Sequence, residues 1–334
     1  MSRFAVMLNS MDRPDWCMHP RVSPQVRLAV MLLNNLSGRS EFGLVIDWKF
    51  HLKRKWVSAY TPHLVDAIVA AFNPVIITSQ LSYALNRKRL KYILSFEPGI
   101  AAPKIKYGRN GECKKGVIYS DPHYQPVERM RYFEDNGFDL VFSLYKRPFF
   151  HHFTGFPEEK FIHWPWAVPD RFISTHPVEV RSNEVAIFGG RQSDAYDVRN
   201  WCREQPGVTS FEFSGVENKQ LSDEEFYRWL AGFDAVVAAG SSSPDFNLVT
   251  PKYFEIAAAG ALLLGQYCDD LVDLGFNESN YLGFRKEDFR EKLEAYRRRP
   301  QDYLETRRRG RELIRERHKL SDRIQALREA FYGG

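Results

Sequence analysis

The residues best suited to chemistry lie at the start of one predicted helix, at Lys252 and Glu255. Thr250 before them is a good N-cap, and Pro251 occupies the first helical position, where its missing N–H has no cost. Lys252 and Glu255 are three residues apart, so they share one helix face. A helix N-terminus favours an anion, and the added lysine suits a diphosphate. Because the Glu255 carboxylate could accept hydrogen bonds from vicinal hydroxyls, we expect a nucleotide-sugar site here.

The rest of this segment predicts close packing of the helix. Ala257, Ala258 and Ala259 carry little bulk, so the helix can lie close against a sheet or a ligand. Gly260 supplies a left-handed stop, and 261–264 is an apolar run of strand length. The alternative is an ordinary amphipathic helix on which Lys252 and Glu255 form an exposed pair.

Two other segments could complete an anion and sugar site. Paired glycines after a predicted strand let the backbone approach a phosphate, and a following arginine can bind it with two hydrogen bonds. The loop 238–247 also follows a predicted strand, where ligands of α/β proteins bind. The alternatives are a plain turn and a flexible connector. The candidates are Gly189, Gly190 and Arg191 in the turn, and Ser241, Asp245 and Asn247 in the loop.

Three residues in the first half could supply a general base. Glu97 and Asp121 each follow a predicted strand, and His123 lies two residues beyond Asp121. Glutamate, aspartate and histidine can each take a proton from an attacking hydroxyl. A further group, Asp12, Asp15 and His19, follows the first predicted strand. The alternative is turn formation, because aspartate before proline commonly starts turns.

A metal site is not expected. His151, His152 and His163 lack ligand spacing with nearby carboxylates. The four cysteines, at positions 17, 113, 202 and 268, have no C-x-x-C spacing, which fits a reducing cytoplasm. No apolar run reaches the eighteen residues that a membrane-spanning helix needs.

The elements that would position these residues alternate between strand and helix, which predicts parallel sheets. We expect an α/β protein with two Rossmann-like, doubly wound domains facing across a cleft. The expected strands are 4–8, 43–46, 74–78, 92–96, 117–119, 140–143, 161–164, 184–188, 209–214, 235–238 and 261–265. The expected helices are 23–36, 62–72, 81–90, 125–136, 147–153, 195–204, 222–231 and 251–259, followed by a helical tail.

The chain length of 334 residues favours two domains. Prolines disfavour helix near 165–181, so we place the boundary there. We expect one domain at 1–168, a second at 180–310, and a C-terminal helix at 311–334.

Charge is distributed unevenly along the chain. Residues 1–115 hold 18 Lys and Arg against 7 Asp and Glu, although the net charge of the whole chain is only +5. Clusters such as Arg87, Lys88 and Arg89 suggest an anionic partner: a phospholipid surface, a phosphorylated saccharide or nucleic acid. The alternative is a solvated face that keeps the protein soluble.

The segment from Lys252 to Gly260 resembles the K-x-F-E-x-x-A-x-G motif of group-1 GT-B glycosyltransferases. The resemblance implies that Glu255 binds the donor ribose, that Arg191 lies near the donor phosphates, and that no metal or cofactor is needed. It also implies that the domain at 1–168 binds the acceptor, that the domain at 180–310 binds the nucleotide sugar, and that the helix at 311–334 packs toward the first domain. Retaining relatives have a glutamate eight residues before the ribose-binding one. Asn247 stands there instead, so the resemblance leaves open whether the enzyme is retaining or inverting.

The resemblance implies a glycosyltransferase, which we expect in the cytoplasm or at the inner membrane face. Its donor would be a UDP- or GDP-linked sugar, and its acceptor an anionic glycan, lipid-linked molecule or DNA. Two alternatives remain: a nucleotide-sugar epimerase, and a non-catalytic protein that docks on nucleic acid or membrane.

Overall fold

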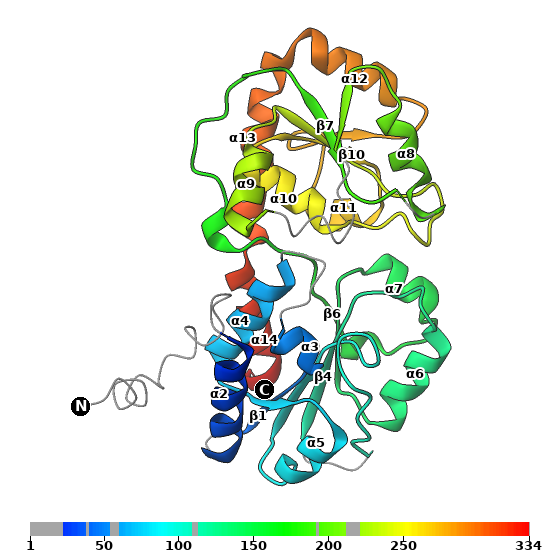
Figure 1. Ribbon diagram of the computed structural model, residues 1–334. Coiled ribbons are helices and arrows are strands. Elements are labelled where there is room, and N and C mark those ends of the chain that lie inside the picture. The colour runs from blue at the N-terminus through cyan, green and yellow to red at the C-terminus, as the bar shows by residue number, and fades with distance from the viewer. Residues whose placement is uncertain are drawn as a thin grey trace, which may run out of the picture.

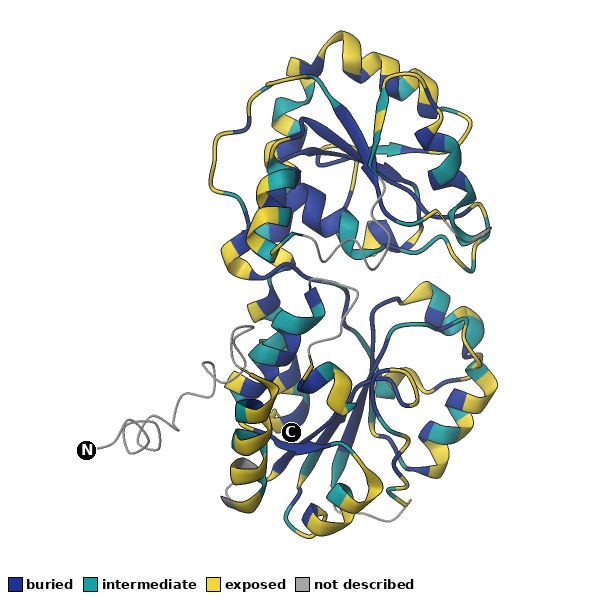
Figure 2. Ribbon diagram, viewed as in Figure 1, coloured by how far each residue is buried: buried dark blue, intermediate teal, exposed yellow. Residues whose placement is uncertain are grey.

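The computed structural model describes residues 23–37, 40–53, 60–108, 113–191, 194–211 and 221–333. Two parallel sheets, each covered by helices on both faces, form two domains (Figure 1). This arrangement confirms the expected α/β class with two doubly wound domains. The central strands are buried, and the outward helix faces are exposed (Figure 2). No helix in the described part of the chain is long and apolar enough to cross a membrane.

The first sheet has six strands in the order β2-β1-β3-β4-β5-β6. Apolar residues fill its central positions, and Leu44 pairs in register with both Ile76 and Leu94. Because β1 connects to β2 on one side and β2 returns to β3 on the other, the topology switches between β1 and β3. The strands are β1 (Phe42–Val45), β2 (Val75–Ile77), β3 (Tyr92–Ser95), β4 (Lys114–Tyr119), β5 (Leu140–Ser143) and β6 (Phe161–His163).

Helices cover both faces of this sheet, and α2 protects its edge. The side-chain amide of Asn35 in α2 bonds the backbone N–H and C=O of Ile76 in edge strand β2, both at 3.0 Å. Asn35 therefore occupies the place of a missing strand partner. The helices are α2 (Pro24–Ser37), α3 (Trp48–His51), α4 (Tyr60–Phe72), α5 (Gln80–Asn86), α6 (Pro126–Asp135) and α7 (Arg147–His152).

The second sheet has five strands in the order β11-β10-β9-β7-β8, with its topology switch between β7 and β9. Its strands are β7 (Val185–Phe188), β8 (Val208–Phe211), β9 (Ala235–Ala238), β10 (Leu262–Gln266) and β11 (Leu282–Phe284). Its helices are α8 (Asp197–Arg203), α9 (Asp223–Ala231), α10 (Pro251–Ala259), α11 (Asp270–Asp273), α12 (Phe289–Arg298) and α13 (Leu304–Arg317).

The last helix, α14 (Leu320–Tyr332), lies in the first domain. Leu327 and Phe331 belong to the core formed by the first sheet and α4. Trp164, at the end of β6, donates its indole N–H to the carbonyl of Arg323 at 3.1 Å. The C-terminal helix is therefore part of the first domain's hydrophobic core.

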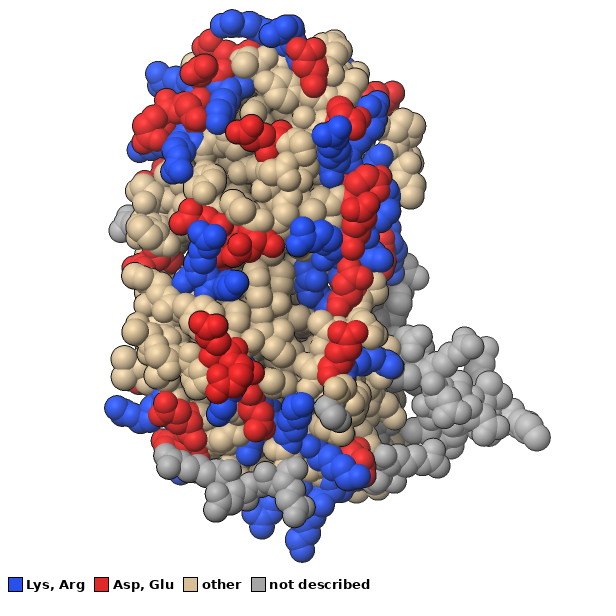
Figure 3. All heavy atoms as spheres, turned by 180° about the vertical axis from the view of Figure 1, so that it is seen from behind, with Lys and Arg blue, Asp and Glu red and all other residues tan. Residues whose placement is uncertain are grey.

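Two expected strands and one strand that was not expected differ from the sequence analysis. The strand expected at 4–8 lies outside the described residues, as does the end of the one expected at 209–214. Strand β11 was not predicted, because three partly buried residues give too short a pattern. On the face seen in Figure 3, basic and acidic side chains are interspersed over both domains.

Candidate active site

The carboxyl ends of both sheets face each other, and the sequence-predicted residues lie on the loops between them. Glu97 and Asp121 follow β3 and β4, whereas Gly189 and Ser241 follow β7 and β9. Ligands of open α/β sheets bind at this edge, where the topology switches. Gly189 and Ser241 flank the switch between β7 and β9, so a ligand is expected here. We call the region between these facing loops the crevice.

Helix α10 points its N-terminus at this crevice. It begins at Pro251 and ends at Gly260, whose φ of 80° is left-handed, as predicted. Thr250 is the N-cap in extended conformation, but its side chain makes no capping hydrogen bond, contrary to our expectation. The first turn of α10 therefore keeps N–H groups available for a ligand.

Lys252 projects from this first turn onto the turn that follows β7. A Cβ on Gly189, whose φ is 111°, would collide with Lys252 Nζ, so only glycine fits there. The ammonium forms no hydrogen bond or salt bridge with any described residue. Burial and the guanidinium of Arg199 hold the pKa of Lys252 well below its usual range, against the opposing effect of Glu255. A bound anion would restore its charge.

Glu255 lies one turn further along α10 and is only 6% exposed, which excludes the exposed Lys–Glu pair. Burial raises the pKa of this carboxyl to about 7; Lys252 lowers the pKa and Asp223 raises it. Among the described residues it has no hydrogen-bond or salt-bridge partner. A buried acceptor without a protein donor suits a ligand that brings hydroxyl groups.

Two buried arginines that we did not predict stand beside Lys252. Arg199 donates from Nε to the carbonyl of Ala239 at 2.8 Å, and Arg203 donates to the carbonyl of Gly189. The predicted Arg191 lies further out, exposed, with Nη2 donating to Ser210 Oγ at 3.2 Å. The positive charge nearest Lys252 thus comes from α8, because residues four apart, such as Arg199 and Arg203, lie on the same face of a helix.

The loop after β9 is held in place by hydrogen bonds. Ser241 Oγ and Ser242 N donate to Asp197 Oδ1 at 2.9 and 2.8 Å. Gln266 bonds Gly240 N at 2.9 Å and the carbonyl of Ser241 at 2.8 Å. Asp197 and Gln266 thus fix this loop, so it is an ordered wall of the crevice.

A cavity of about 360 Å³ lies between this loop and α7 of the first domain. Asn247 and Asp245 line it; the Asn247 amide nitrogen donates to the Tyr267 carbonyl at 2.9 Å, while Oδ1 is buried without a partner. The Asp245 carboxylate lies 3.3 Å from His152 Nε2 and 4.0 Å from His151 Nε2. Both domains therefore supply polar groups to one cavity.

His151, His152 and Asp245 also form a group, in the described part of the chain, that could hold a metal ion. Their ligand atoms all lie within 4.8 Å of one another. Burial lowers the pKa of His152, which favours the neutral imidazole that binds metals. This grouping was not predicted from the sequence, because Asp245 is distant from both histidines along the chain.

The three candidate bases form one cluster at the ends of β3 and β4. Glu97, 3% exposed, accepts hydrogen bonds from Ser120 Oγ at 2.6 Å and Ser120 N at 3.1 Å. Burial and the nearby Asp121 raise the pKa of Glu97 to about 7. Burial also raises the pKa of Asp121, although His123 and Arg129 oppose this. The His123 ring packs edge-on against Phe246 of the second domain, with centroids 4.8 Å apart.

The third candidate group, Asp12, Asp15 and His19, lies outside the described residues.

Other contacts join the domains around the crevice. His63 Nε2 lies 2.6 Å from Asp223 Oδ2, next to Glu255. The Asp270 carboxylate accepts from the backbone N–H groups of Lys146 and Arg147 at 3.1 and 3.0 Å.

Known proteins share this fold, and part of the sequence matches a family model. The model of a family described as "Glycosyl transferase-like" matches residues 175–329. Anabaena Alr3699/HepE in complex with UDP has 12% identity over 91% of this chain and 96% of its own, with a TM-score of 0.58. A glycosyltransferase from Rickettsia africae ESF-5 has 10% identity over 79% and 86%, with a TM-score of 0.53.

TarM has 11% identity and a TM-score of 0.52; the match covers 72% of this chain and about half, 54%, of TarM. No curated protein sequence matches the chain. At these identities the likeness to solved structures concerns the fold. The chain has the GT-B fold of these proteins, and its residues 175–329 are similar to the glycosyl transferase-like family.

Proposed function

We propose that the protein is a glycosyltransferase that takes a sugar from a UDP- or GDP-linked donor. One observation carries the proposal: the Lys252 ammonium and the Glu255 carboxylate have no hydrogen-bond or salt-bridge partner among the described residues, yet both lie at the topology switch of the second sheet. The ammonium only lies over the Phe188 ring, 5.1 Å from its centroid. Two solved structures of the similar Anabaena protein contain UDP or UDP-glucose. A donor nucleotide would give both groups their missing partners.

In this arrangement the diphosphate binds at the N-terminus of α10, against Gly189 and Lys252. Glu255 accepts hydrogen bonds from the ribose hydroxyls. Hydrogen-bond donors and positive charges placed where negative charge develops stabilise the leaving diphosphate. This is usually the largest electrostatic contribution to such a reaction. Because Lys252, Arg199 and the helix N-terminus supply positive charge, we propose that the reaction needs neither a metal nor a cofactor. Chelator should therefore leave the rate unchanged.

The donor sugar would occupy the cavity between Asn247 and α7, beside Asp245 and Ser242. Asp121 would remove the proton from the acceptor hydroxyl. The neighbouring His123 and Glu97 would influence how readily the Asp121 carboxyl ionises. The acceptor oxygen forms a bond to the anomeric carbon, the carbon–oxygen bond to the diphosphate breaks, and the diphosphate leaves with the electron pair. Closure of the two domains would exclude water from this step.

We further propose an anionic and extended acceptor in the cytoplasm, with a membrane-linked glycan ahead of nucleic acid. Arg87 and Lys88 are exposed at the end of α5, on the side of the first domain remote from the second (Figure 1). They cannot reach a small acceptor in the crevice, so their charge would act on a long polyanion or an anionic membrane.

Titration calorimetry with UDP, GDP and UDP-glucose tests the donor site. We expect K252M to weaken the preferred nucleotide about a hundred-fold, because a charge-assisted contact in a buried site is lost. E255A should weaken it about ten-fold. K286M is the control, since Lys286 is exposed outside the crevice. Failure of the wild type to bind any nucleotide at millimolar concentration would refute the proposal.

A further inference from the structure

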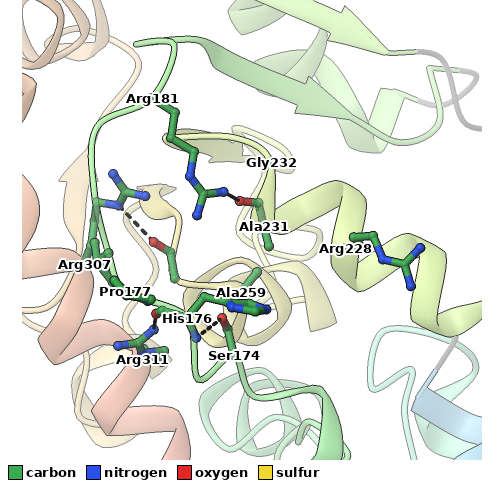
Figure 4. A pocket seen from close by; sticks show the side chains of 12 residues that line it. Ser174, His176, Pro177, Arg181, Arg228, Ala231, Gly232, Ala259, Arg307 and Arg311 are labelled. Atoms are coloured by element: carbon green, nitrogen blue, oxygen red, sulfur yellow. Dashed lines mark hydrogen bonds between the residues drawn. The ribbon is translucent and has the colours of Figure 1, made fainter.

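A second cavity lies at the far end of α10, away from the crevice. Its volume is about 240 Å³. Figure 4 shows it between the linker that joins the domains, the end of α9 and helix α13. Since a nine-residue helix is about 13 Å long, this cavity is separate from the site at Lys252. Its lining comprises Ser174, His176, Pro177, Val178, Arg181, Arg228, Ala231, Gly232, Ala259, Gly260, Arg307 and Arg311.

Four arginines line this cavity, and no acidic residue does. Arg307 is only 4% exposed, and it donates from Nε to the Gly260 carbonyl at 2.9 Å and from Nη1 to the Glu179 carbonyl at 3.0 Å. Nη1 also lies 3.3 Å from Asp234 Oδ1. The third nitrogen, Nη2, makes no hydrogen bond with the described residues. A buried guanidinium thus keeps one donor group for a ligand.

Arg311 has even fewer partners. Its Nη1 donates to the His176 carbonyl, while its Nε is buried and has no hydrogen-bond partner. Within the described ranges Arg311 forms no salt bridge, and neither does Arg228, which lies further out than the other three arginines (Figure 4). Arg181 and Arg307, in contrast, pair with Glu179 and Asp234 at 3.2 and 3.3 Å. The lining therefore carries two positive charges without a paired carboxylate.

Such crowding of like charge is unfavourable in a partly buried place. Burial, then the neighbouring Arg315, lowers the pKa of Arg311. Glu312 opposes this, whereas Arg308 and Arg307 act in the same direction as burial. Backbone carbonyls accept hydrogen bonds from these arginines but bring no net charge. An oxyanion would provide both hydrogen-bond acceptors and negative charge. The planar guanidinium fork matches phosphate oxygens.

We propose that this cavity binds the phosphate group of a small phosphorylated metabolite. The volume exceeds what a free phosphate ion fills, so it leaves room for a small organic part beside the phosphate. The site does not depend on the proposed transferase activity.

The position of the cavity indicates what binding would change. Ser174 in the linker donates its N–H to the Ala258 carbonyl at 2.9 Å, and Arg315 donates to the Ser174 carbonyl at 3.1 Å. The cavity thus lies between the linker and the second domain. A ligand contacting Arg311 and Arg181 would hold the linker against α10 and α13, and so restrict movement between the domains.

Thermal unfolding of K252M with inorganic phosphate, and separately with glucose 6-phosphate, tests the proposal. K252M removes the lysine of the donor site, so stabilisation reports on another site. We expect each ligand to raise the melting temperature at millimolar concentration. Binding of glucose 6-phosphate at least ten-fold tighter than binding of phosphate would identify a phosphorylated metabolite as the ligand. Equal affinities would contradict the proposal that the ligand has an organic part, and would leave a free phosphate ion as the ligand.

Adding R311Q should weaken phosphate binding at least ten-fold, R228Q should weaken it less, and R298Q should have no effect. Arg298 is the matched control, because it is exposed on α12 and paired with Glu294. Unchanged UDP binding by R311Q alone would show that this variant folds and that the two sites are separate. No stabilisation of K252M by either ligand, or equal stabilisation with R311Q, would overturn the proposal.

Discussion

Asp270 of the second domain accepts a hydrogen bond of 3.0 Å from the backbone N–H of Arg147 in the first. Arg147 is the first residue of α7, and the neighbouring Lys146 N–H donates to the same carboxylate at 3.1 Å. The side chain of Lys146, the N-cap residue of α7, makes no capping hydrogen bond. Asp270 therefore caps this helix from across the crevice and holds the domains together on the side of the Asp245 cavity.

Removing this carboxylate should favour opening of the crevice. D270A leaves two N–H groups of α7 without an acceptor, which costs about 1–2 kcal/mol, as for other helix caps. We expect a larger radius of gyration in X-ray scattering and a lower kcat. D273N is the control: Asp273 only pairs with the half-exposed Arg147 side chain at 3.6 Å. An unchanged radius and kcat in D270A would show that the contact does not restrain closure.

Glu255 should reduce the stability of the free protein at high pH. Its carboxyl pKa rises from 4.5 to about 7 on folding, because burial and Asp223 outweigh Lys252. A raised folded-state pKa means that stability is full below pH 4.5 and falls as the pH rises through about 7. E255Q removes this loss, so it should be more stable than wild type at pH 8 by up to roughly 3 kcal/mol.

Denaturant unfolding at pH 4 and pH 8 measures this difference, which should vanish at pH 4. E225Q is a control with the opposite sign. Glu225 is exposed, and hydrogen bonds from Ser222 lower its carboxyl pKa, so its replacement should reduce stability at pH 8. A gain in E255Q that is equal at both pH values would mean that the buried charge is not its cause.

Helix α10 was predictable because its start and end are encoded locally. Pro251 and Gly260 mark its limits, and three consecutive alanines explain how closely it packs. The functional grouping was less predictable. Arg199 comes to Lys252 only because α8 and α10 meet at Gly189, and Asp245 meets His152 only when the domains close. Contacts between distant elements leave no spacing in the sequence, so Arg199 and the pairing of Asp245 with His152 were not predicted.

The rate should depend on the ionisation of Glu97 and Asp121 together. The two carboxyls interact, and burial raises the pKa of both, that of Glu97 to about 7. As a base must be deprotonated, kcat/KM should rise through about pH 7 and then level off. D121N should lower kcat at least a hundred-fold. E97Q should move the midpoint of the profile downward, because Asp121 then ionises without a neighbouring charge.

The same profile in E97Q as in wild type would exclude this coupling. S120A provides the comparison, since it removes only the 2.6 Å hydrogen bond from Ser120 Oγ to Glu97. Without that bond the Glu97 carboxylate is less stabilised, so the midpoint should move upward. Opposite shifts in E97Q and S120A would separate the charge of Glu97 from the effect of a general loss of packing.

The basic residues at the end of α5 should affect a long acceptor but not the donor. Arg87 and Lys88 are exposed, whereas Arg89 is partly buried and donates to the Asn35 carbonyl at 2.5 Å, so it supports α2. We expect R87Q/K88Q to weaken binding to anionic vesicles or a polyanionic glycan and to flatten its salt dependence, because fewer counterions are released. UDP affinity should stay unchanged, and R89Q should instead lower the melting temperature. Salt titrations of both variants separate these effects: wild-type acceptor binding by R87Q/K88Q would show that this cluster is only a solvated face.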